Sequence, residues 1–269
     1  MHELLAAVMG LVEGLTEFLP VSSTGHLILA GRWLGFEQAL GREVAATFEI
    51  FIQLGAILAV VVAYPGRFAG LLDVRRREGF AGWRGIGLLA CTSAPAFLIG
   101  ALAHDWIKEH LFAPWSVAVG LAVGALWILA TEWRRPAVRT QGLDVIQWPQ
   151  ALSVGLFQCL ALWPGLSRSA ATILGAMLLG IDRKTATEYS FFAAVPVLCA
   201  AAIADLVKSI DQLSSAHLQL LGIGLVVSFV SALAAVKWLL HYVAGHSLSV
   251  FAWYRLVLAA VVLIFTLRG

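Results

Sequence analysis

Residues 13–26 of the chain, EGLTEFLPVSSTGH, place polar and helix-breaking residues inside an apolar stretch that runs from 4 to 35. Two glutamates, two serines and a histidine are costly to bury unless each finds a partner. Pro20 and Gly25 interrupt the helix, and each half is too short to cross a bilayer by itself. We therefore predict a helix, a break and a second helix that returns to the side of entry.

The composition around this stretch is that of a membrane protein. Of 269 residues, 60% are hydrophobic and 13% charged, whereas soluble domains average about 25% charged residues. The net charge of +2 gives no indication of nucleic-acid binding. We expect a single all-α polytopic membrane domain, residues 1–269. Six segments approach the roughly 20 residues that a crossing needs: 44–64, 86–103, 114–131, 186–204, 218–236 and 251–267.

The basic residues orient these spans, because cytoplasmic loops are enriched in arginine and lysine. The loops 65–85 and 132–150 hold most of them: Arg67, Arg75, Arg76, Arg77, Arg84, Arg134, Arg135 and Arg139. The loop 104–113 holds only Lys108, beside Asp105 and Glu109. We expect 65–85 and 132–150 on the cytoplasmic side and 104–113 outside. Three further residues continue this pattern if the second broken stretch enters from the cytoplasm: Arg183, Lys184 and Lys237.

A second broken apolar stretch, 151–180, divides the chain into two similar halves. Each half contains one re-entrant hairpin followed by three spans. Because three is an odd number, the two halves have opposite orientations, as in transporters with inverted repeats. We predict an inverted-topology repeat, about 1–149 and 150–269, with the two hairpin tips meeting near mid-membrane.

Two sequence matches in the same order support this duplication. GLVEGLTEFLPVSSTG, which begins at Gly10, resembles GLFQCLALWPGLSRSA, which begins at Gly155. Glu13 aligns there with Gln158, and with one gap Ser23 aligns with Ser167. Further on, ATFEIF at 46–51 resembles ATEYSF at 186–191.

The carboxylates of the first break indicate a cation site. Glu13 and Glu17 are four residues apart and share one face of a helix. Two buried carboxylates are tolerated when a cation lies between them, and oxygen ligands favour Mg²⁺ or Ca²⁺. The alternative is that both carboxylates are solvated in a water-filled cavity.

The hydroxyl groups that follow lie at the start of the next helix. Ser22, Ser23 or Thr24 is expected to cap it, and with Gly25 they surround free backbone N–H groups that suit a phosphate. His26 is either a packing histidine or, beside these groups, an acid–base or nucleophilic residue.

The second break, PGLSRSAAT at 164–172, contributes an arginine without an acidic neighbour in sequence. A guanidinium group matches a phosphate bidentately, so Arg168 is expected to bind one. Donors around it come from Gly165, Ser167, Ser169 and Thr172. Alternatively, Arg168 pairs with Glu13 or Glu17, and the two interpretations are compatible.

Carboxylates, a hydroxyl or imidazole nucleophile and an arginine are the groups that phosphoryl transfer needs. Their place inside a bilayer implies that a lipid carries the phosphate. Four further polar residues either line the same cavity or lie at span ends: Glu49, Gln53, Glu188 and Ser190.

Both motifs, in this order and at this distance, closely resemble the bacitracin-resistance type of undecaprenyl-diphosphate phosphatase. The resemblance covers essentially the whole chain and includes FEIFIQLGAILAVVV and FQCLALWPGLSRSAATI. It implies an integral hydrolase of the bacterial plasma membrane whose site opens to the periplasm. Such an enzyme removes the terminal phosphate of undecaprenyl diphosphate, which recycles the lipid carrier for peptidoglycan synthesis. The resemblance also implies dependence on Mg²⁺ or Ca²⁺ and a link to bacitracin resistance.

Motif by motif, the resemblance implies the site residues. It places the family's glutamate pair on Glu13 and Glu17, its serine and histidine on Ser23 and His26, and its arginine on Arg168. Our hypothesis makes Ser23 the nucleophile with His26 as its acid–base partner, and leaves open direct attack by His26 or by water. In the same hypothesis the two glutamates hold the divalent cation on the diphosphate and one of them also serves as a base. Arg168 and the hydroxyls of Ser167 and Thr172 stabilise charge on the transferring phosphoryl group.

A second class of function stays open at this point. An inverted repeat also suits a transporter, here a flippase that returns the same lipid carrier across the membrane. The sequence leaves the oligomeric state open, and the small-residue stretch GLAVGALWILA at 120–130 is a candidate homodimer interface.

Overall fold

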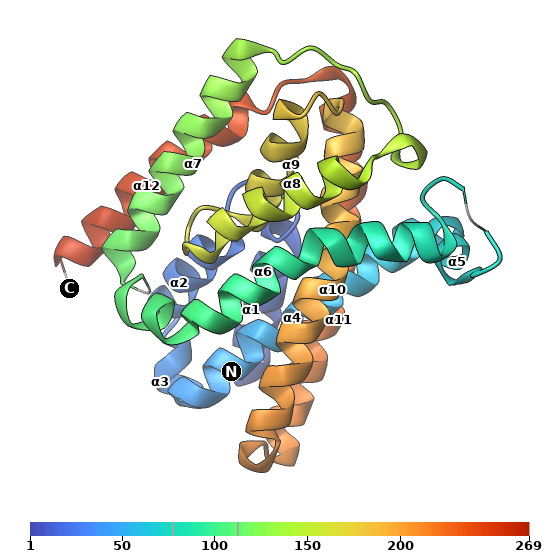
Figure 1. The fold of residues 1–269 in the computed structure, drawn as a ribbon. Coiled ribbons are helices and arrows are strands. Elements are labelled where there is room, and N and C mark those ends of the chain that lie inside the picture. Colours follow the sequence, from blue (N-terminus) through green and yellow to red (C-terminus); the bar gives the residue numbers. More distant parts are fainter. Residues whose placement is uncertain (77, 112, 269) are drawn as a thin grey trace.

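The computed structural model describes residues 1–76, 78–111 and 113–268, and its regular elements in this part of the chain are helices (Figure 1). Arg77, which we predicted in a cytoplasmic loop, lies outside the described residues. The α-helices are α1 (His2–Thr16), α2 (Ser23–Trp33), α3 (Phe36–Leu40), α4 (Arg42–Ala63), α5 (Pro65–Leu72), α6 (Gly82–His110), α7 (Pro114–Arg134), α8 (Trp148–Cys159), α9 (Arg168–Leu178), α10 (Arg183–Ser209), α11 (Ser215–Gly245) and α12 (Ser249–Arg268). Single 3₁₀ turns lie at Leu143–Val145, Leu160–Leu162 and Ile210–Gln212.

The six predicted spans are confirmed as helices that are long and apolar enough to cross a membrane. They are α4, the part Gly82–Ala103 of α6, α7, α10, α11 and the part Ser249–Thr266 of α12. The segment 104–113 lies between the spans Gly82–Ala103 and α7, as predicted, but it is helical over most of its length because α6 continues to His110. Residues 101–113 contain no glycine or proline that would end it, and Pro114 then begins α7 at a position where a missing N–H costs nothing.

The two broken stretches form short helix pairs, as predicted from their helix-breaking residues. In the first, α1 ends at Thr16 and α2 begins at Ser23; in the second, α8 ends at Cys159 and α9 begins at Arg168. The first helix of each pair packs against a long helix from the other half of the chain, α1 against α11 and α8 against α6. Between them α4 and α10 pack together, and α7 packs along α12 (Figure 1).

Glycine allows the close approach of α1 to α11 and of α8 to α6. A Cβ atom at Gly10 would overlap the carbonyl oxygen of Gly224, and one at Gly155 would overlap that of Thr92. The two glycines that the sequence aligned therefore have the same role in their respective helix pairs.

The arginine-rich loops lie at one end of the bundle and bind each other. Arg67 forms an ion pair of 2.8 Å with Asp144, and Arg84 donates to the Ile146 carbonyl at 2.6 Å. Hydrogen bonds from the Arg67 guanidinium and the Phe80 amide hold the pKa of the Asp144 carboxyl below its ordinary value. The loops 65–85 and 132–150 thus share one end, and the side of the membrane that it faces stays a prediction.

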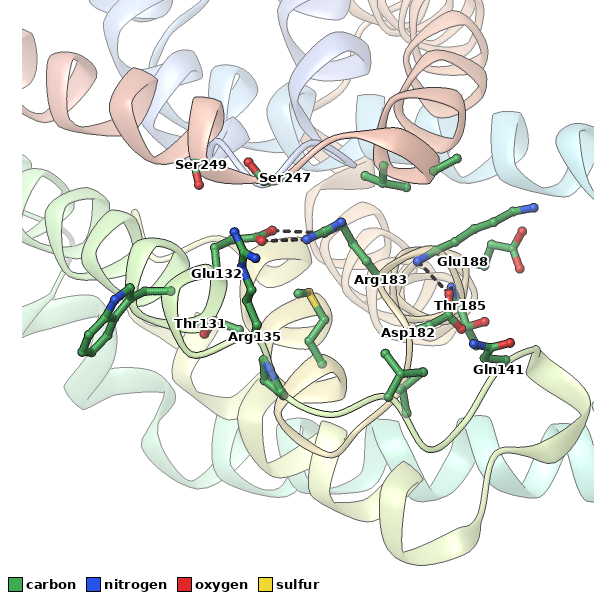
Figure 2. Close-up of a pocket in the computed structure, with 18 of the residues that line it drawn as sticks. Thr131, Glu132, Arg135, Gln141, Asp182, Arg183, Thr185, Glu188, Ser247 and Ser249 are labelled. Atoms are coloured by element: carbon green, nitrogen blue, oxygen red, sulfur yellow. Dashed lines mark hydrogen bonds and ion pairs between the residues drawn. The ribbon is translucent and has the colours of Figure 1, made fainter.

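A cavity of about 1120 Å³ opens at this same end of the bundle. Figure 2 shows that Glu132 on α7 and Arg183 on α10 meet beside it, with N–O distances of 2.6 and 3.0 Å. Glu132 also accepts the Leu248 amide at 2.7 Å, which ties α7 and α10 to the turn before α12. The lining residues come from α7, α10, the C-terminal parts of α9 and α11 and the loops between them, so this cavity is separate from the residues of the two breaks.

The glycines of the candidate dimer interface are turned inward. Gly120 and Gly124 on α7 are buried, with Gly120 against the Pro164 carbonyl and Gly124 against the Arg255 guanidinium. These two residues pack within the chain, so the small residues at these positions serve contacts inside the bundle.

We expect Gly10→Ala to destabilise the protein, because the added methyl group has to push α1 away from α11. Overpacking of this kind costs about 1–3 kcal/mol, which thermal unfolding in detergent will detect. Gly222→Ala on α11 is the matched control, since a Cβ atom there meets nothing within 4 Å. Equal unfolding temperatures for the two variants would contradict the close approach of α1 and α11.

Candidate functional site

The breaks between the helices of each pair meet inside the bundle. Arg168, the first residue of α9, donates from Nη2 to Oε1 of Glu17 at 2.8 Å. Ser169 donates from its hydroxyl to the carbonyl oxygen of Leu19 at 2.8 Å. Two segments separated by about 150 residues in sequence are therefore joined by an ion pair and a hydrogen bond.

A strained serine stands before each of the two short helices. Ser22 has φ 73° and Ser167 has φ 77°, a region that residues with a side chain rarely occupy. Each hydroxyl caps its helix, Ser22 by accepting the Gly25 amide at 3.4 Å and Ser167 by accepting the Ala170 amide at 3.3 Å. Strain at such positions costs about 1–3 kcal/mol and persists only where the surroundings hold it.

The matching caps correct one detail of the predicted alignment. Ser22 and Ser167 are equivalent, so Ser23 corresponds to Arg168 and the predicted match of Ser23 with Ser167 is wrong by one residue. One residue, Val21, lies between Pro20 and Ser22, whereas two residues, Gly165 and Leu166, lie between Pro164 and Ser167. This extra residue offsets the gap that the alignment needs before Pro164, so the two serines that cap the helices match without a gap.

Arg168 is buried among polar and aromatic partners. Its side chain is 11% exposed and that of Glu17 is 6% exposed. Nη1 donates to the carbonyl and the hydroxyl of Ser190 at 3.0 and 3.3 Å, and the guanidinium lies 5.3 Å from the centre of the Phe18 ring. Its Nε atom is buried without a hydrogen-bond partner among the described residues. The pairing with Glu17 confirms the alternative interpretation of Arg168, and it leaves the Nε–H group without a partner among the described residues.

The carboxylates of the first break differ in their partners. Both oxygens of Glu17 have a partner, because Oε1 pairs with Arg168 and Oε2 accepts the Ser23 hydroxyl at 2.6 Å. Glu13 is completely buried, and neither of its oxygens has a hydrogen-bond partner in the part of the chain that the structure describes. The like charges of Glu17 and Glu49 act on it, and the positive charge of Arg168 acts in the opposite sense. A buried carboxylate beside like charges is unfavourable unless a cation joins it.

His26 is oriented by a residue that the sequence analysis did not single out. Its Nδ1 lies 2.7 Å from the Ser22 carbonyl and its Nε2 lies 2.6 Å from the Tyr254 hydroxyl, and the two rings stack at 5.5 Å. Because a carbonyl can only accept, a neutral His26 has its proton on Nδ1 and accepts the Tyr254 hydroxyl at Nε2. In this arrangement the Ser23 hydroxyl donates its hydrogen bond to Glu17 and not to His26.

The other hydroxyl groups support the two tips. Thr172 is buried and lies 2.7 Å from the Ser190 hydroxyl, so it positions a partner of Arg168. Ser167 and Ser169 lie 3.0 Å apart. The remaining predicted residues of the tips are half-buried Thr24, Gly25, which packs on Leu121, and Gly165, which has φ 93°.

The four residues predicted to line the same cavity are divided by the structure. Ser190 contacts Arg168 directly. Glu49 is half-buried and acts on Glu13 electrostatically, with Gln53 half-buried one turn further along α4. Glu188 instead lines the cavity at the arginine-rich end (Figure 2). Residues two apart on an α-helix point to opposite sides, so Ser190 and Glu188 cannot serve one site.

Helix α12 adds two consecutive polar residues to the site, Tyr254 and Arg255. Arg255 is 0% exposed and donates to carbonyl groups of both tips. A signal was available for this residue, because an ionisable group inside an apolar span is functional by default.

These features define a class of protein. A bundle with six candidate spans holds two capped helix N-termini, a buried arginine, an unpaired carboxylate and a hydroxyl group that donates to a second carboxylate. Such a set, inside apolar surroundings, suits a phosphate group, and the fold is that of an integral membrane protein with an internal polar site.

The comparisons with known proteins identify the family. The family model described as "Bacitracin resistance protein BacA" matches residues 6–261, and the chain belongs to this family. Similar curated proteins are named undecaprenyl-diphosphatase. That of Maridesulfovibrio salexigens is 54% identical over 260 residues, or 97% of each chain. That of Oleidesulfovibrio alaskensis is 55% identical over 263 residues, or 97% of this chain and 98% of that one. That of Acidovorax ebreus is 49% identical over 271 residues.

A double-mutant cycle tests the ion pair at the centre of the site. We expect Glu17→Gln and Arg168→Met to be coupled, because each one alone leaves the other charge buried without its partner. Contacting residues in such networks couple by about 0.5–3 kcal/mol, which unfolding in detergent can measure. The control is the exposed pair Arg67–Asp144, for which at most about 1 kcal/mol is expected. Coupling no larger than in this control would contradict the buried pair.

Proposed function

We propose that this protein is an undecaprenyl-diphosphatase, which hydrolyses undecaprenyl diphosphate to undecaprenyl phosphate and inorganic phosphate. This reaction returns the lipid carrier to peptidoglycan and other envelope synthesis, and it accounts for the bacitracin resistance in the family's name. Family membership over residues 6–261 and relatives of that name at about 55% identity support it. The structural observation that carries the proposal is the buried chain of contacts from Arg168 through Glu17 to Ser23.

The electrostatics of the site suit a transferring phosphoryl group. Two helix N-termini, those of α2 and α9, carry partial positive charge and free amides, and Arg168 adds a guanidinium group that shares its charge with Glu17 and has an unpartnered Nε–H. Charge on the equatorial oxygens of the phosphoryl group needs such preorganised donors. In the proposal Arg168 is the main donor to these oxygens. The Ser167 hydroxyl, which caps α9, holds the N-terminus of that helix in place.

The nucleophile in this proposal is Ser23. Its hydroxyl already donates to Glu17 Oε2 at 2.6 Å, so Glu17 is placed to accept the proton. A bond forms between Ser23 Oγ and the terminal phosphorus while the bond to the bridging oxygen breaks, and undecaprenyl phosphate leaves. Water then hydrolyses the phosphoserine, which releases phosphate and restores the hydroxyl.

His26 is proposed as an acid–base residue for proton transfer at the site. Its place in the first turn of α2 and its bond to Tyr254 support this, because the tyrosine fixes the ring and supplies a second dissociable proton. To act on substrate or water, Nε2 must exchange its bond with Tyr254 for a new one.

A divalent cation, Mg²⁺ or Ca²⁺, fits the carboxylates of α1. The two unpaired, buried oxygens of Glu13 lie next to Glu17, and hard oxygen ligands suit these ions. No group of three or more histidine, cysteine or acidic side chains with metal-site geometry occurs among the residues that the structure describes. Two carboxylates would therefore hold the ion together with water and substrate phosphate, which is common for Mg²⁺. When bound, it supplies neutralisation of phosphate charge.

The finer topology is also part of the proposal. We propose that the α1–α2 and α8–α9 pairs are re-entrant hairpins of an inverted repeat. The crossed packing of α1 on α11 and α8 on α6, the equivalent glycines and the equivalent strained caps support it. We also propose that this protein lies in the plasma membrane with its arginine-rich end in the cytoplasm. In that orientation the first hairpin enters from the periplasm and the site opens to that side.

Hydrolysis by the purified protein in detergent tests the function. We expect phosphate release from undecaprenyl diphosphate, lost on chelation of divalent cations, and a decrease on the order of 10²–10³ in turnover for Arg168→Ala. Arg134→Ala, at an exposed arginine, is the control and should retain activity. Detergent removes any gradient, so release separates an enzyme from the predicted flippase. Near-normal hydrolysis by a folded Arg168→Ala protein would refute the role of this residue.

Trapping of the intermediate tests the nucleophile. With label in the terminal phosphate and rapid acid quenching, we expect covalent label on the peptide that contains Ser23 and none in Ser23→Ala. Acid-stable serine phosphate and acid-labile histidine phosphate are distinguished by a parallel quench in base. Label on His26, or single turnovers without any labelled protein, would overturn the assignment to Ser23.

A further inference from the structure

Arg255 on α12 is a buried cation without an acidic partner. Its side chain is 0% exposed, in the middle of a span, and no carboxylate lies within ion-pair distance among the described residues. Burying an unpaired charge is expensive, and a well-packed apolar residue is often at least as favourable for stability. Folding stability by itself therefore does not account for an arginine at this position.

The guanidinium group binds five backbone carbonyl groups from three segments. It donates to Pro20 at 3.2 Å in the first tip and to Gly165 and Leu166 at 3.0 and 2.9 Å in the second. The other two acceptors are Gly120 and Leu121 of α7, both at 3.2 Å. One side chain thus fastens both tips to each other and to a long helix.

Three of these five carbonyl groups lie in the segments that lead into the strained turns. Leu166 directly precedes Ser167, and Pro20 lies two residues before Ser22, the two serines with positive φ. In a planar trans peptide the N–H points opposite to the C=O. Holding the Leu166 carbonyl on the α12 side therefore directs the Ser167 amide to the other side, at the start of the helix that begins with Arg168.

We propose that Arg255 is a positioning residue for the hydrolytic reaction. It acts through the backbone, since it keeps both strained serine turns in the geometry that places Ser23 and Arg168, and it does not touch the substrate. This inference rests on the proposed function of the two tips. If it is correct, the site also needs Arg255, a residue of the last helix that lies far from both sequence motifs.

Three variants separate a positioning role from a merely structural one. Arg255→Met removes the donors but retains most of the volume, and Arg255→Lys retains charge with three donors in place of five. Gly124→Ala leaves the arginine intact, but its Cβ atom would overlap the Arg255 guanidinium and push it from the carbonyl groups. Gly222→Ala is the control for the glycine change.

We expect kcat to fall on the order of 100-fold in Arg255→Met and Gly124→Ala, since small misplacements of reacting groups have effects of this size. KM for undecaprenyl diphosphate should stay within about threefold, because ground-state binding is largely retained. Arg255→Lys should restore part of the loss, and Gly222→Ala should behave as the unmodified protein. Hydrogen exchange should quicken in peptides covering 17–25 and 161–170 and remain unchanged in α11.

Hydrogen exchange and kcat measured on the same variants test the proposal together. Unchanged exchange in both tips of folded Arg255→Met and Gly124→Ala would overturn the proposal that Arg255 holds them. Faster exchange at the tips with unchanged kcat would overturn its role in the reaction. If Arg168→Ala is then also fully active, the proposed function of the tips fails; if Arg168→Ala is inactive, only the role of Arg255 fails.

Discussion

The structure depends on one requirement, that charge and free backbone groups buried in an apolar bundle find partners there. The Arg168–Glu17 ion pair meets it across the two tips, because the partner of opposite charge for each residue comes from the other tip. Once these residues are joined, Ser23, Ser190 and Phe18 gather around them. The site is therefore also one of the contacts between the two halves of the chain, beside the packing of α1 on α11, α8 on α6 and α4 on α10.

The same requirement explains why the last helix is part of the site. The broken stretches leave carbonyl groups without helical partners, and in apolar surroundings such groups are costly unless another part of the protein donates to them. Arg255 satisfies carbonyl groups of both tips and of α7, and Tyr254 satisfies the free nitrogen of His26. Two consecutive residues of α12 therefore form hydrogen bonds with the site. Arg255 donates to the backbone of the tips, and Tyr254 contacts the His26 side chain.

Much of the architecture follows from local patterns in the sequence. Apolar runs of sufficient length predicted six spans, and proline and glycine predicted the breaks near Pro20 and Pro164, because these features act on the helix in which they occur. The clustering of arginines predicted that two loops share an end, which the Arg67–Asp144 pair confirms. The pairing of Arg168 with Glu17 was also foreseen as an alternative, since a buried arginine needs an acidic or anionic partner.

The sequence alone determined which residues had to be explained: Glu13, Glu17, Ser23, His26 and Arg168, polar groups in apolar stretches that cannot remain unpartnered. The tertiary structure alone decided which partner each receives. Ser23 is bonded to Glu17, His26 to a tyrosine 228 residues away, and Glu188 points away from the site although Ser190 two residues later belongs to it. These contacts depend on how distant helices are set side by side and rotated. Hydrophobic periodicity does not specify that rotation when a helix is apolar on every side, as spans in a membrane are.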